Sequence, residues 1–346
     1  MSADPAMLAD TREPVRSGPI LSVKDLHAHF RTTHFGVNRY VRAVDGISFD
    51  VRRGEIYGLA GESSSGKTTL VKTIAGAIKP PLKVVGGTIE FAFLPGYGGL
   101  HRAPPAEVAR IRWRHLSYIM QGSMNVLNPV RRLRQSFVDF AKPHIAGTAK
   151  EFETAVIGHL ARVKLDASVL AAYPHELSGG MRQRATIALA TICRPDFIIA
   201  DEPTTALDVV VQKDVLGMIS SIQREIGSSV LFVTHDMGVH AHLTDRLGIM
   251  YAGRLVEEAA TPEIFRNPRH PYTRHLISSL PRIGDDVQRQ GLEGAPPSLA
   301  DPPPGCRFHP RCPLAMEVCS RRVPDMIETT PAHRVACFAV NGSGEP

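Results

Sequence analysis

The segment at residues 61–68 restricts the possible folds more than any other part of the chain. It is Gly-Glu-Ser-Ser-Ser-Gly-Lys-Thr, which fits the pattern G-x-x-x-x-G-K-[ST]. A compact apolar run at residues 56–60 comes directly before it, and a helical pattern follows. A buried strand that ends in such a loop at the start of a helix binds phosphate groups through backbone N–H groups. The segment therefore predicts a phosphate-binding loop in an α/β domain.

The glycine, lysine and hydroxyl residues of this loop have distinct chemical roles. Gly61 and Gly66 allow the backbone to turn so that its N–H groups face the phosphates. Lys67 is expected to reach the β- and γ-phosphates, and the Thr68 hydroxyl to hold Mg²⁺. The predicted nucleotide contacts are Gly61, Ser63, Ser64, Ser65, Gly66, Lys67, Thr68 and Thr69.

Two adjacent acidic residues follow a second apolar run, at residues 197–200. At the end of a neighbouring strand, Asp201 is placed to orient hydrated Mg²⁺. Glu202 is placed to polarise the attacking water, as a general base that acts through its position more than through a shifted pKa. A solvated acidic pair at a strand end would show the same pattern. The phosphate-binding loop upstream favours the chemical role.

Apolar strands alternate with helical patterns around these motifs. Short alternating runs in residues 20–51 predict antiparallel strands. Residues 207–226 carry one apolar helix face, and residues 229–234 form another buried strand. This alternation predicts an α/β fold with a mainly parallel sheet that is covered on both sides. Residues 96–178 show mixed helical patterning with proline breakers, so we expect a helical insertion there.

A further helix opens at residues 177–184, Leu-Ser-Gly-Gly-Met-Arg-Gln-Arg, with Ser178 as a natural N-cap. Alone, this segment indicates only a helix start. Together with the phosphate-binding loop it matches a signature motif, and residues 20–268 resemble the nucleotide-binding subunit of an ATP-binding cassette (ABC) transporter, a P-loop NTPase fold. The resemblance implies binding of ATP and Mg²⁺ and an ATPase activity.

The resemblance assigns roles to residues outside the loop. Gln121 matches the Q-loop residue, which touches Mg²⁺ and the lytic water and senses the membrane subunits. Asp208 matches the D-loop residue, and His235 matches the switch histidine that contacts the γ-phosphate. The implied catalytic residues are Glu202, His235 and Gln121, and the implied Mg²⁺ ligands are Thr68, Gln121 and Asp201.

Three positions fit the family pattern less directly. An insertion at residues 32–38 leaves Phe30 and Tyr40 as candidates for the aromatic residue that stacks on adenine, with Tyr40 slightly preferred. Either ring can instead belong to the core. Ser64 stands where the loops of the family usually have glycine. Serine fits most conformations of such a loop, so we expect ATP binding to survive. The φ angle of Ser64 decides whether serine is strained at this position.

The resemblance also implies partners. In the family, the signature residues act on ATP held by another subunit, which gives Ser178, Gly179 and Gly180 that role here. A head-to-tail dimer with a homologous or identical ATP-binding subunit is therefore expected. Hydrolysis would reopen the dimer, and the motion would pass to membrane subunits through a groove near residues 121–129.

Several segments narrow the resemblance to one subfamily. Residues 61–63, 127–129 and 270–273, and above all Gly-Cys-Arg-Phe-His-Pro-Arg-Cys-Pro at residues 305–313, are similar to the ATPases of oligopeptide, dipeptide and nickel importers. This implies a peripheral subunit on the cytoplasmic face of the cell membrane. It would power import, by default of peptides, through two permeases served by an extracytoplasmic binding protein. The alternative is a soluble cassette ATPase of DNA repair or translation, which usually has a second cassette or a long coiled-coil insertion.

Charge and hydropathy limit the other function classes. The 346 residues carry a formal net charge of +6, and the basic residues are mostly dispersed without interleaved aromatic residues, so no nucleic-acid partner is expected. No apolar run approaches the ~20 residues that span a bilayer. The N-terminus lacks the pattern of a secretory signal, so we expect a cytosolic chain with reduced thiols.

Four of the five cysteines lie in the C-terminal region, which we place at residues 269–340. They are Cys306, Cys312, Cys319 and Cys337. A reducing compartment disfavours disulfides, and zinc usually uses closer cysteine pairs. Four thiolates can hold a [4Fe–4S] cluster. The resemblance to the importer tail favours that cluster as a structural or redox-sensing group, with Zn²⁺ and free thiols as alternatives.

Overall fold

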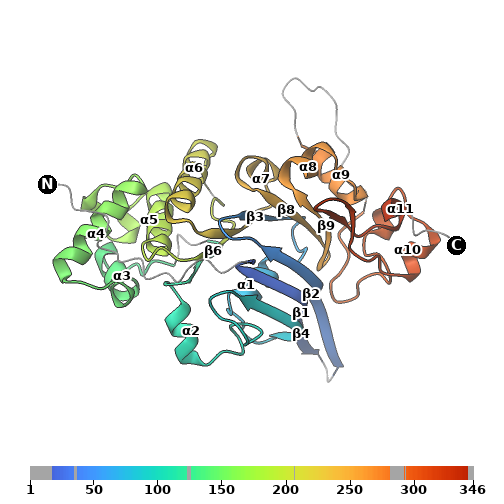
Figure 1. Ribbon diagram of the computed structural model, residues 1–346, viewed down its shortest axis with the longest axis horizontal. Helices are drawn as coiled ribbons and strands as arrows, with labels where there is room; N and C mark the ends of the chain where they lie inside the picture. Colours follow the sequence, from blue (N-terminus) through green and yellow to red (C-terminus); the bar gives the residue numbers. More distant parts are fainter. Residues whose placement is uncertain are drawn as a thin grey trace.

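A large mixed sheet crosses the middle of the molecule in the computed structural model (Figure 1). The structure describes residues 18–34, 37–122, 126–205, 207–280, 292 and 294–341. Within them the strand order of this sheet is β10-β11-β9-β8-β3-β7-β6-β5. The strands are β3 (Ile56–Ala60), β5 (Leu116–Ile119), β6 (Phe197–Asp201), β7 (Ser229–Val233), β8 (Arg246–Tyr251), β9 (Arg254–Ala260), β10 (Ile327–Thr330) and β11 (His333–Val335).

The strands β8, β3, β7, β6 and β5 pair in parallel, as the alternation of strands and helices predicted. Every residue of β3, β6 and β7 is buried, which explains why these strands are nearly continuous apolar runs. Successive side chains point to opposite faces. Ile198 and Phe232 therefore join the core beneath the helical region, while Ile199 and Val233 join the core on the other face.

A second, three-stranded antiparallel sheet covers that other face. Its order is β2-β1-β4, with β1 (Leu21–His34), β2 (Val37–Val51) and β4 (Leu82–Phe91). It shares a core with helix α1 (Lys67–Ile74), whose buried side chains include Leu70 and Ile74. The antiparallel strands expected from residues 20–51 are thus present, and they hold the helix that follows the phosphate-binding loop.

The region expected to be a helical insertion contains helices but also one strand of the central sheet. Its helices are α2 (Pro105–Ile111), α3 (Leu133–Phe140) and α4 (Ala149–Arg162), with 3-10 turns at Lys142–His144, Ala167–Ala171 and Pro174–Glu176. Strand β5 lies between α2 and α3 and pairs with β6. Its four residues are too few for a periodic signal. The domain bounds 20–268 and 269–340 remain predictions.

The remaining helices cover the sheet and build the C-terminal region. They are α5 (Gly179–Thr191), α6 (Val209–Ile226), α7 (Met237–Leu243), α8 (Thr261–Arg266), α9 (Pro271–Ser278), α10 (Glu317–Arg321) and α11 (Phe338–Asn341), with a 3-10 turn at His309–Arg311. In Figure 1, α3 and α4 lie at one end of the long axis and α10 and α11 at the other.

The C-terminal region continues the central sheet. Strand β11 pairs antiparallel with β9 and β10 pairs with β11, so the sheet extends past the β8–β9 hairpin. A third core contains Tyr251 of that hairpin together with Tyr272 and Phe308. The cysteine-bearing segment is therefore packed against the β8–β9 hairpin, and β8 pairs with β3, the strand that leads to the phosphate-binding loop.

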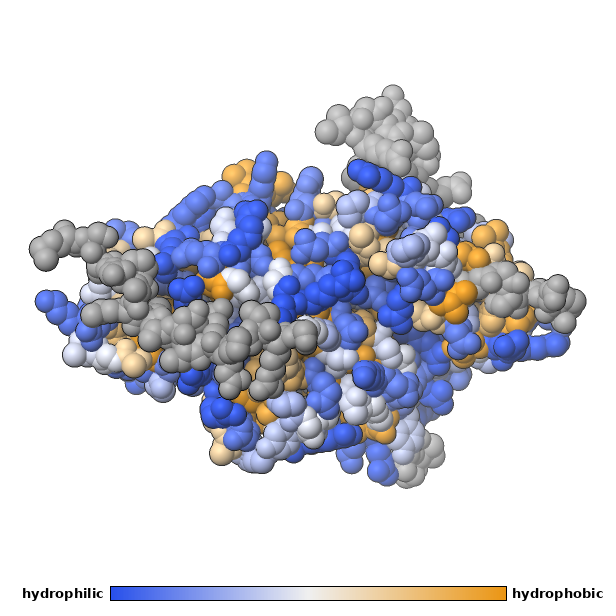
Figure 2. Space-filling model, in the orientation of Figure 1, coloured by the Kyte–Doolittle hydropathy of each residue, from blue (hydrophilic) through white to orange (hydrophobic). Residues whose placement is uncertain are grey.

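The visible surface is mostly hydrophilic, with hydrophobic residues in small separate patches (Figure 2). None of the helices in the described part of the chain has the length and apolar character needed to cross a bilayer.

Candidate nucleotide site

The phosphate-binding loop connects β3 to α1, as its sequence predicted. Gly61 and Gly66 have φ angles of 150° and 102°. A Cβ atom would lie 2.1 Å from the Met250 carbonyl oxygen at Gly61, and 2.0 Å from the Ala43 carbonyl oxygen at Gly66. Both positions therefore require glycine for two independent reasons, the left-handed backbone and the close approach of neighbouring carbonyl groups.

Lys67 begins α1 and folds over the loop. Its Nζ donates to the carbonyl oxygens of Gly61 at 2.7 Å and Glu62 at 2.8 Å, and to Ser65 Oγ at 3.2 Å. Burial lowers the pKa of Lys67 to about 8, although the nearby charges of Glu202, Asp201 and Glu62 oppose the shift. Lys67 is therefore still mainly cationic at neutral pH, as a ligand of phosphate oxygens must be.

Asp201 ends strand β6 and is fully buried. Its Oδ2 accepts a hydrogen bond from the Tyr118 hydroxyl at 3.2 Å, and its Oδ1 is buried with no partner among the described residues. Burial raises the pKa of Asp201 to about 6; the hydrogen bond from Tyr118 opposes this shift and the charge of Glu202 adds to it. A buried carboxylate oxygen without a partner fits Mg²⁺, a hard cation that prefers oxygen ligands. Thr68 lies in the first turn of α1, and Gln121 follows β5.

Glu202 is the residue on which the predicted catalytic side chains converge. Gln121 Nε2 donates to its Oε2 at 2.9 Å, and His235 Nδ1 lies 3.1 Å from its Oε1. Thr205 Oγ1 donates to Oε2 at 3.0 Å. Burial alone would raise the pKa of Glu202, but hydrogen bonds from His235 and Thr205 and the charges of His235 and Lys67 lower it. The site therefore holds an ionised carboxylate in a fixed position.

The other predicted residues are distributed over several elements. Ser178 caps α5, accepting the Met181 N–H at 3.2 Å, and Gly179 and Gly180 form its first turn. Asp208 caps α6. Phe30 packs partly buried against the core beside α1, whereas Tyr40 is 45% exposed. Ser64 has a φ of 66°, so the position singled out in the sequence does adopt the left-handed conformation.

Nothing in the sequence predicted that two further groups of residues lie at the nucleotide site. Tyr118 lies on β5, a strand too short to be recognised. Arg311 and Tyr272 come from the C-terminal region and contact Glu62 of the phosphate-binding loop. Nothing along the chain places the cysteine-bearing segment near the nucleotide, but the structure brings its Arg311 into contact with the phosphate-binding loop.

The four C-terminal cysteines come together in space as free thiols. Cys306 interacts electrostatically with each of Cys312, Cys319 and Cys337, and its N–H donates to the Cys319 carbonyl at 2.8 Å. Burial raises the pKa of the Cys306 thiol to about 11, and the other three thiols contribute to the shift. No three of these four sulfurs lie within 4.8 Å of one another.

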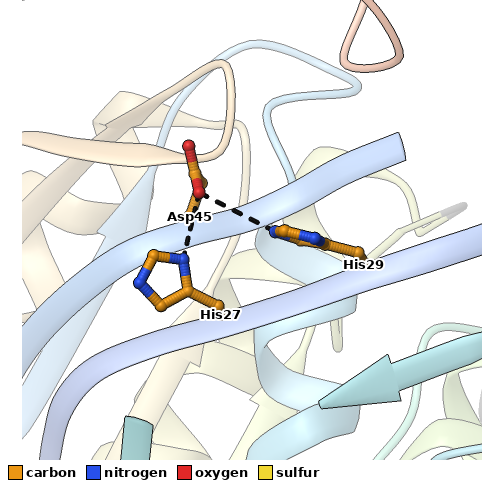
Figure 3. Close-up of side chains that lie close together, drawn as sticks. All are labelled: His27, His29 and Asp45. Atoms are coloured by element: carbon orange, nitrogen blue, oxygen red, sulfur yellow. Dashed lines mark hydrogen bonds and ion pairs between the residues drawn. The ribbon is translucent and has the colours of Figure 1, made fainter. Parts of the chain in front are cut away.

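A second polar cluster joins β1, β2 and the C-terminal region. Figure 3 shows its part on β1 and β2, the side chains of His27, His29 and Asp45. Asp45 Oδ1 lies 3.0 Å from His27 Nδ1 and 3.7 Å from His29 Nε2. The second oxygen of Asp45 pairs with Arg254 at 3.0 Å and with Arg307. These ligand atoms are close enough for a metal ion, but the two guanidinium groups already supply the positive charge that an ion would bring. The cluster therefore links the C-terminal region to the antiparallel sheet by ion pairs.

Comparisons with known proteins agree with this geometry. The sequence profile of the ABC transporter family matches residues 44–205, and that of the oligopeptide/dipeptide transporter C-terminal region matches residues 256–319. The dipeptide transport ATP-binding protein DppD of Bacillus subtilis is 40% identical over 92% of this chain and 94% of its own length. A probable peptide ABC transporter ATP-binding protein of Sinorhizobium fredii is 38% identical over 93% and 95%.

Solved structures show the same fold. A dimeric bacterial ABC transporter cassette is 23% identical and has a TM-score of 0.59, covering 70% of this chain and 98% of its own. The protein cbiO1 from Clostridium perfringens, part of the ABC transporter complex cbiONQ, is also 23% identical, with a TM-score of 0.57 over 72% of this chain and 91% of its own. The family profiles and the long relatives together show that this chain belongs to the ATP-binding proteins of ABC transporters, with the C-terminal region of the oligopeptide and dipeptide group.

Proposed function

We propose that this chain hydrolyses ATP on the cytoplasmic face of the cell membrane to power the import of peptides through partner permeases. The observation that carries the proposal is the convergence of Gln121 and His235 on Glu202, beside the phosphate-binding loop. The relatives named for dipeptide or peptide transport cover nearly the whole chain, including its C-terminal region, which supports peptides as the substrate.

The chemistry follows from the charges in the site. Lys67 and the loop N–H groups bind the β- and γ-phosphates, and Tyr40, the more exposed aromatic candidate, stacks on adenine. Asp201 and Thr68 would hold Mg²⁺, which neutralises charge on the phosphates when bound. Glu202 accepts a hydrogen bond from the attacking water and orients it toward the γ-phosphate. Gln121 and His235 hold Glu202 in place until the nucleotide is bound, and then contact the water and the γ-phosphate themselves.

A dimer completes the nucleotide site in this proposal. Ser178 is exposed at the start of α5, as a residue that acts on a second subunit's ATP must be. Val209 and Val210, at the start of α6 beside Asp208, are 80% and 79% exposed. Burial of these two side chains against a second subunit would remove apolar surface from water and favour the dimer. The second subunit is a copy of this chain or a homologous ATP-binding subunit.

The membrane partners would dock on the segment around Gln121. Three apolar side chains near this residue are exposed: Met120 at 39%, Val126 at 50% and Val130 at 79%. Because Gln121 also contacts Glu202, movement of this surface would reach the catalytic carboxylate directly. This arrangement supports coupling to two permeases, which an extracytoplasmic binding protein supplies with substrate.

Substitution of the catalytic carboxylate tests the proposed hydrolysis. Glu202→Gln should bind MgATP with an affinity close to that of the wild type and lose at least about 100-fold in hydrolysis rate, because the amide is not a base. Phosphate release and nucleotide binding are measured on the same samples. Glu225→Gln is the control, since Glu225 is half-exposed and pairs with Arg162 on the surface. Near-normal hydrolysis by Glu202→Gln would contradict the assignment.

Coupling to transport separates the proposal from the alternative of a soluble cassette ATPase. The chain should co-purify with two permease subunits. Peptide together with its binding protein should stimulate hydrolysis by the reconstituted complex. ATPase activity that responds to nucleic acid and not to these partners would favour the alternative.

The C-terminal cysteines are proposed to hold a [4Fe–4S] cluster. The other three thiols lie close enough to Cys306 to affect its pKa, which supports a group that all four could bind together. Anaerobically purified protein should be brown with broad absorbance near about 400 nm, as four thiolate-ligated irons predict. Colourless protein with one zinc per chain would contradict the cluster.

A further inference from the structure

The loop between Cys306 and Cys312 reaches the phosphate-binding loop through Arg311. Arg311 Nη1 donates to Glu62 Oε2 at 2.9 Å and Nη2 donates to Glu62 Oε1 at 3.3 Å, which is the two-point geometry of a strong guanidinium–carboxylate pair. Only 7% of the Arg311 side chain and 25% of the Glu62 side chain are exposed. Arg311 Nη1 also donates to the Tyr251 hydroxyl at 3.2 Å, which fixes the guanidinium from a second side.

The backbone of Glu62 is held by the same region. Its N–H donates to the Tyr272 hydroxyl at 2.8 Å, and Tyr272 lies on α9. Its carbonyl oxygen accepts from Lys67 Nζ at 2.8 Å. Glu62 is therefore fixed by the C-terminal region through both its side chain and its N–H group, while its carbonyl contacts the lysine that binds phosphate.

A second arginine of the cysteine loop reaches the same site by another route. Arg307 contacts Asp45 and the Ala252 carbonyl oxygen. The Asp45 N–H donates to the Gly253 carbonyl oxygen at 2.9 Å, and the Gly253 N–H donates to the Ser65 carbonyl oxygen at 2.8 Å. Both arginines between the first two cysteines are thus connected to the loop that binds phosphate.

A carboxylate at position 62 is an electrostatic problem for a loop that binds triphosphate. Glu62 lies close enough to Lys67 to interact with its charge. An unpaired carboxylate there would repel the phosphates and compete with them for Lys67. The bidentate contact with Arg311 neutralises Glu62 and keeps its side chain turned toward the C-terminal region.

We propose that Arg311 is a positioning residue for nucleotide binding, because it holds the carboxylate of Glu62 away from the Lys67 ammonium group. The packing of the four-cysteine segment then sets the affinity of the phosphate-binding loop for ATP. The inference rests on the proposed ATPase function, but it concerns binding and not the hydrolytic step. It predicts that a change at Cys312, next to Arg311, reaches the nucleotide mainly through the Arg311–Glu62 ion pair.

Nucleotide binding by the full-length protein tests the proposal. Arg311→Met, which keeps most of the side-chain volume, should weaken MgATP binding on the order of tenfold, because one unpaired carboxylate then faces the phosphates. Arg321→Ala is the control, since Arg321 and its partner Glu317 are 71% and 76% exposed in the same segment. Binding is measured by calorimetry, and thermal unfolding shows that each variant is folded.

The double variant separates charge from packing. Glu62→Gln combined with Arg311→Met should restore binding to within about twofold of Glu62→Gln alone, because no carboxylate is left to repel the phosphates. Wild-type affinity in Arg311→Met would overturn the proposal, as would a loss that persists in the double variant. Failure of the wild type itself to bind MgATP would instead overturn the ATPase function.

A cysteine variant tests the connection to the four-cysteine site. Cys312→Ser should weaken MgATP binding in the wild-type background and have little effect in the Glu62→Gln background, if the effect passes through Arg311. An equal loss in both backgrounds would contradict this route. The experiment measures MgATP binding, so its result does not depend on the rate of ATP hydrolysis or on what the cysteines bind.

Discussion

Two residues of the nucleotide site, Ser64 and Glu202, have backbone conformations that residues other than glycine seldom adopt. Their φ angles are 66° and 47°. Such conformations cost of order 1–3 kcal/mol and persist where the surrounding structure fixes them. Glu202 is fixed by its N–H, which donates to the Val233 carbonyl at 2.8 Å, and by the side chains around its carboxylate. The strain at Glu202 is therefore connected to catalytic positioning.

Ser64 offers a direct measurement of this strain. Ser64→Gly should raise the free energy of unfolding by about 0.5–1 kcal/mol, because glycine adopts positive φ without a steric penalty. Ser63→Gly is the matched control: Ser63 is its exposed neighbour without positive φ, and the change there should lower stability by about 0.5 kcal/mol. Chemical denaturation measures both. A destabilised Ser64→Gly variant would show that the serine makes a favourable contact that outweighs the strain.

At the scale of elements, helix caps and buried strands hold the motifs in the positions that their chemistry requires. Helix α6 begins at Val209, two residues after the expected start, because Asp208 caps it by accepting the Val211 N–H at 2.9 Å. It ends at the expected residue, where Gly227 adopts a left-handed conformation. These local signals explain why the helices around the motifs could be predicted. Strand β5 could not, since its pairing with β6 depends on residues about 80 positions away.

The cap at Asp208 gives a prediction that separates folding from function. Asp208→Ala should lower the free energy of unfolding by about 1 kcal/mol, because the Val211 N–H loses its partner. Asp208→Asn keeps a cap and should be near the wild type in stability. If Asp208 also acts as the D-loop residue at a dimer interface, Asp208→Asn should still reduce hydrolysis. Equal stability of the alanine and asparagine variants would contradict the capping role.

At the scale of the whole molecule, the C-terminal region shares a core with the cassette. Phe308 is 1% exposed, and its ring centroid lies 5.2 Å from that of Tyr251 and 5.5 Å from that of Tyr272. Tyr251 belongs to β8 and Tyr272 to α9, so one aromatic group joins the sheet to the cysteine-bearing segment. This core places Arg311 against Glu62 of the phosphate-binding loop, and Arg307 against Asp45 and Ala252.

Loss of this aromatic contact should affect the whole protein. Phe308→Ala is expected to lower the free energy of unfolding by about 3–5 kcal/mol, because it removes a large buried side chain and leaves a cavity. Nucleotide affinity should fall as well, since Arg311 loses its support. Leu314→Ala, at a side chain that is 47% exposed, should change stability little. A Phe308→Ala protein with unchanged stability would show that the C-terminal region folds separately from the cassette.

The sequence by itself determined the chemistry and its local supports. Each motif depends on residues that are only a few positions apart, so its pattern is visible along the chain. This holds for the glycines, lysine and threonine of residues 61–68, for the acids at 201 and 202, and for the helix caps. Only the tertiary structure decided which distant groups meet. It brought Tyr118 to Asp201, gathered four cysteines separated by up to 31 positions, and placed Arg311 on Glu62 across 249 residues. Such contacts depend on strand order and on a shared core, which no local spacing records.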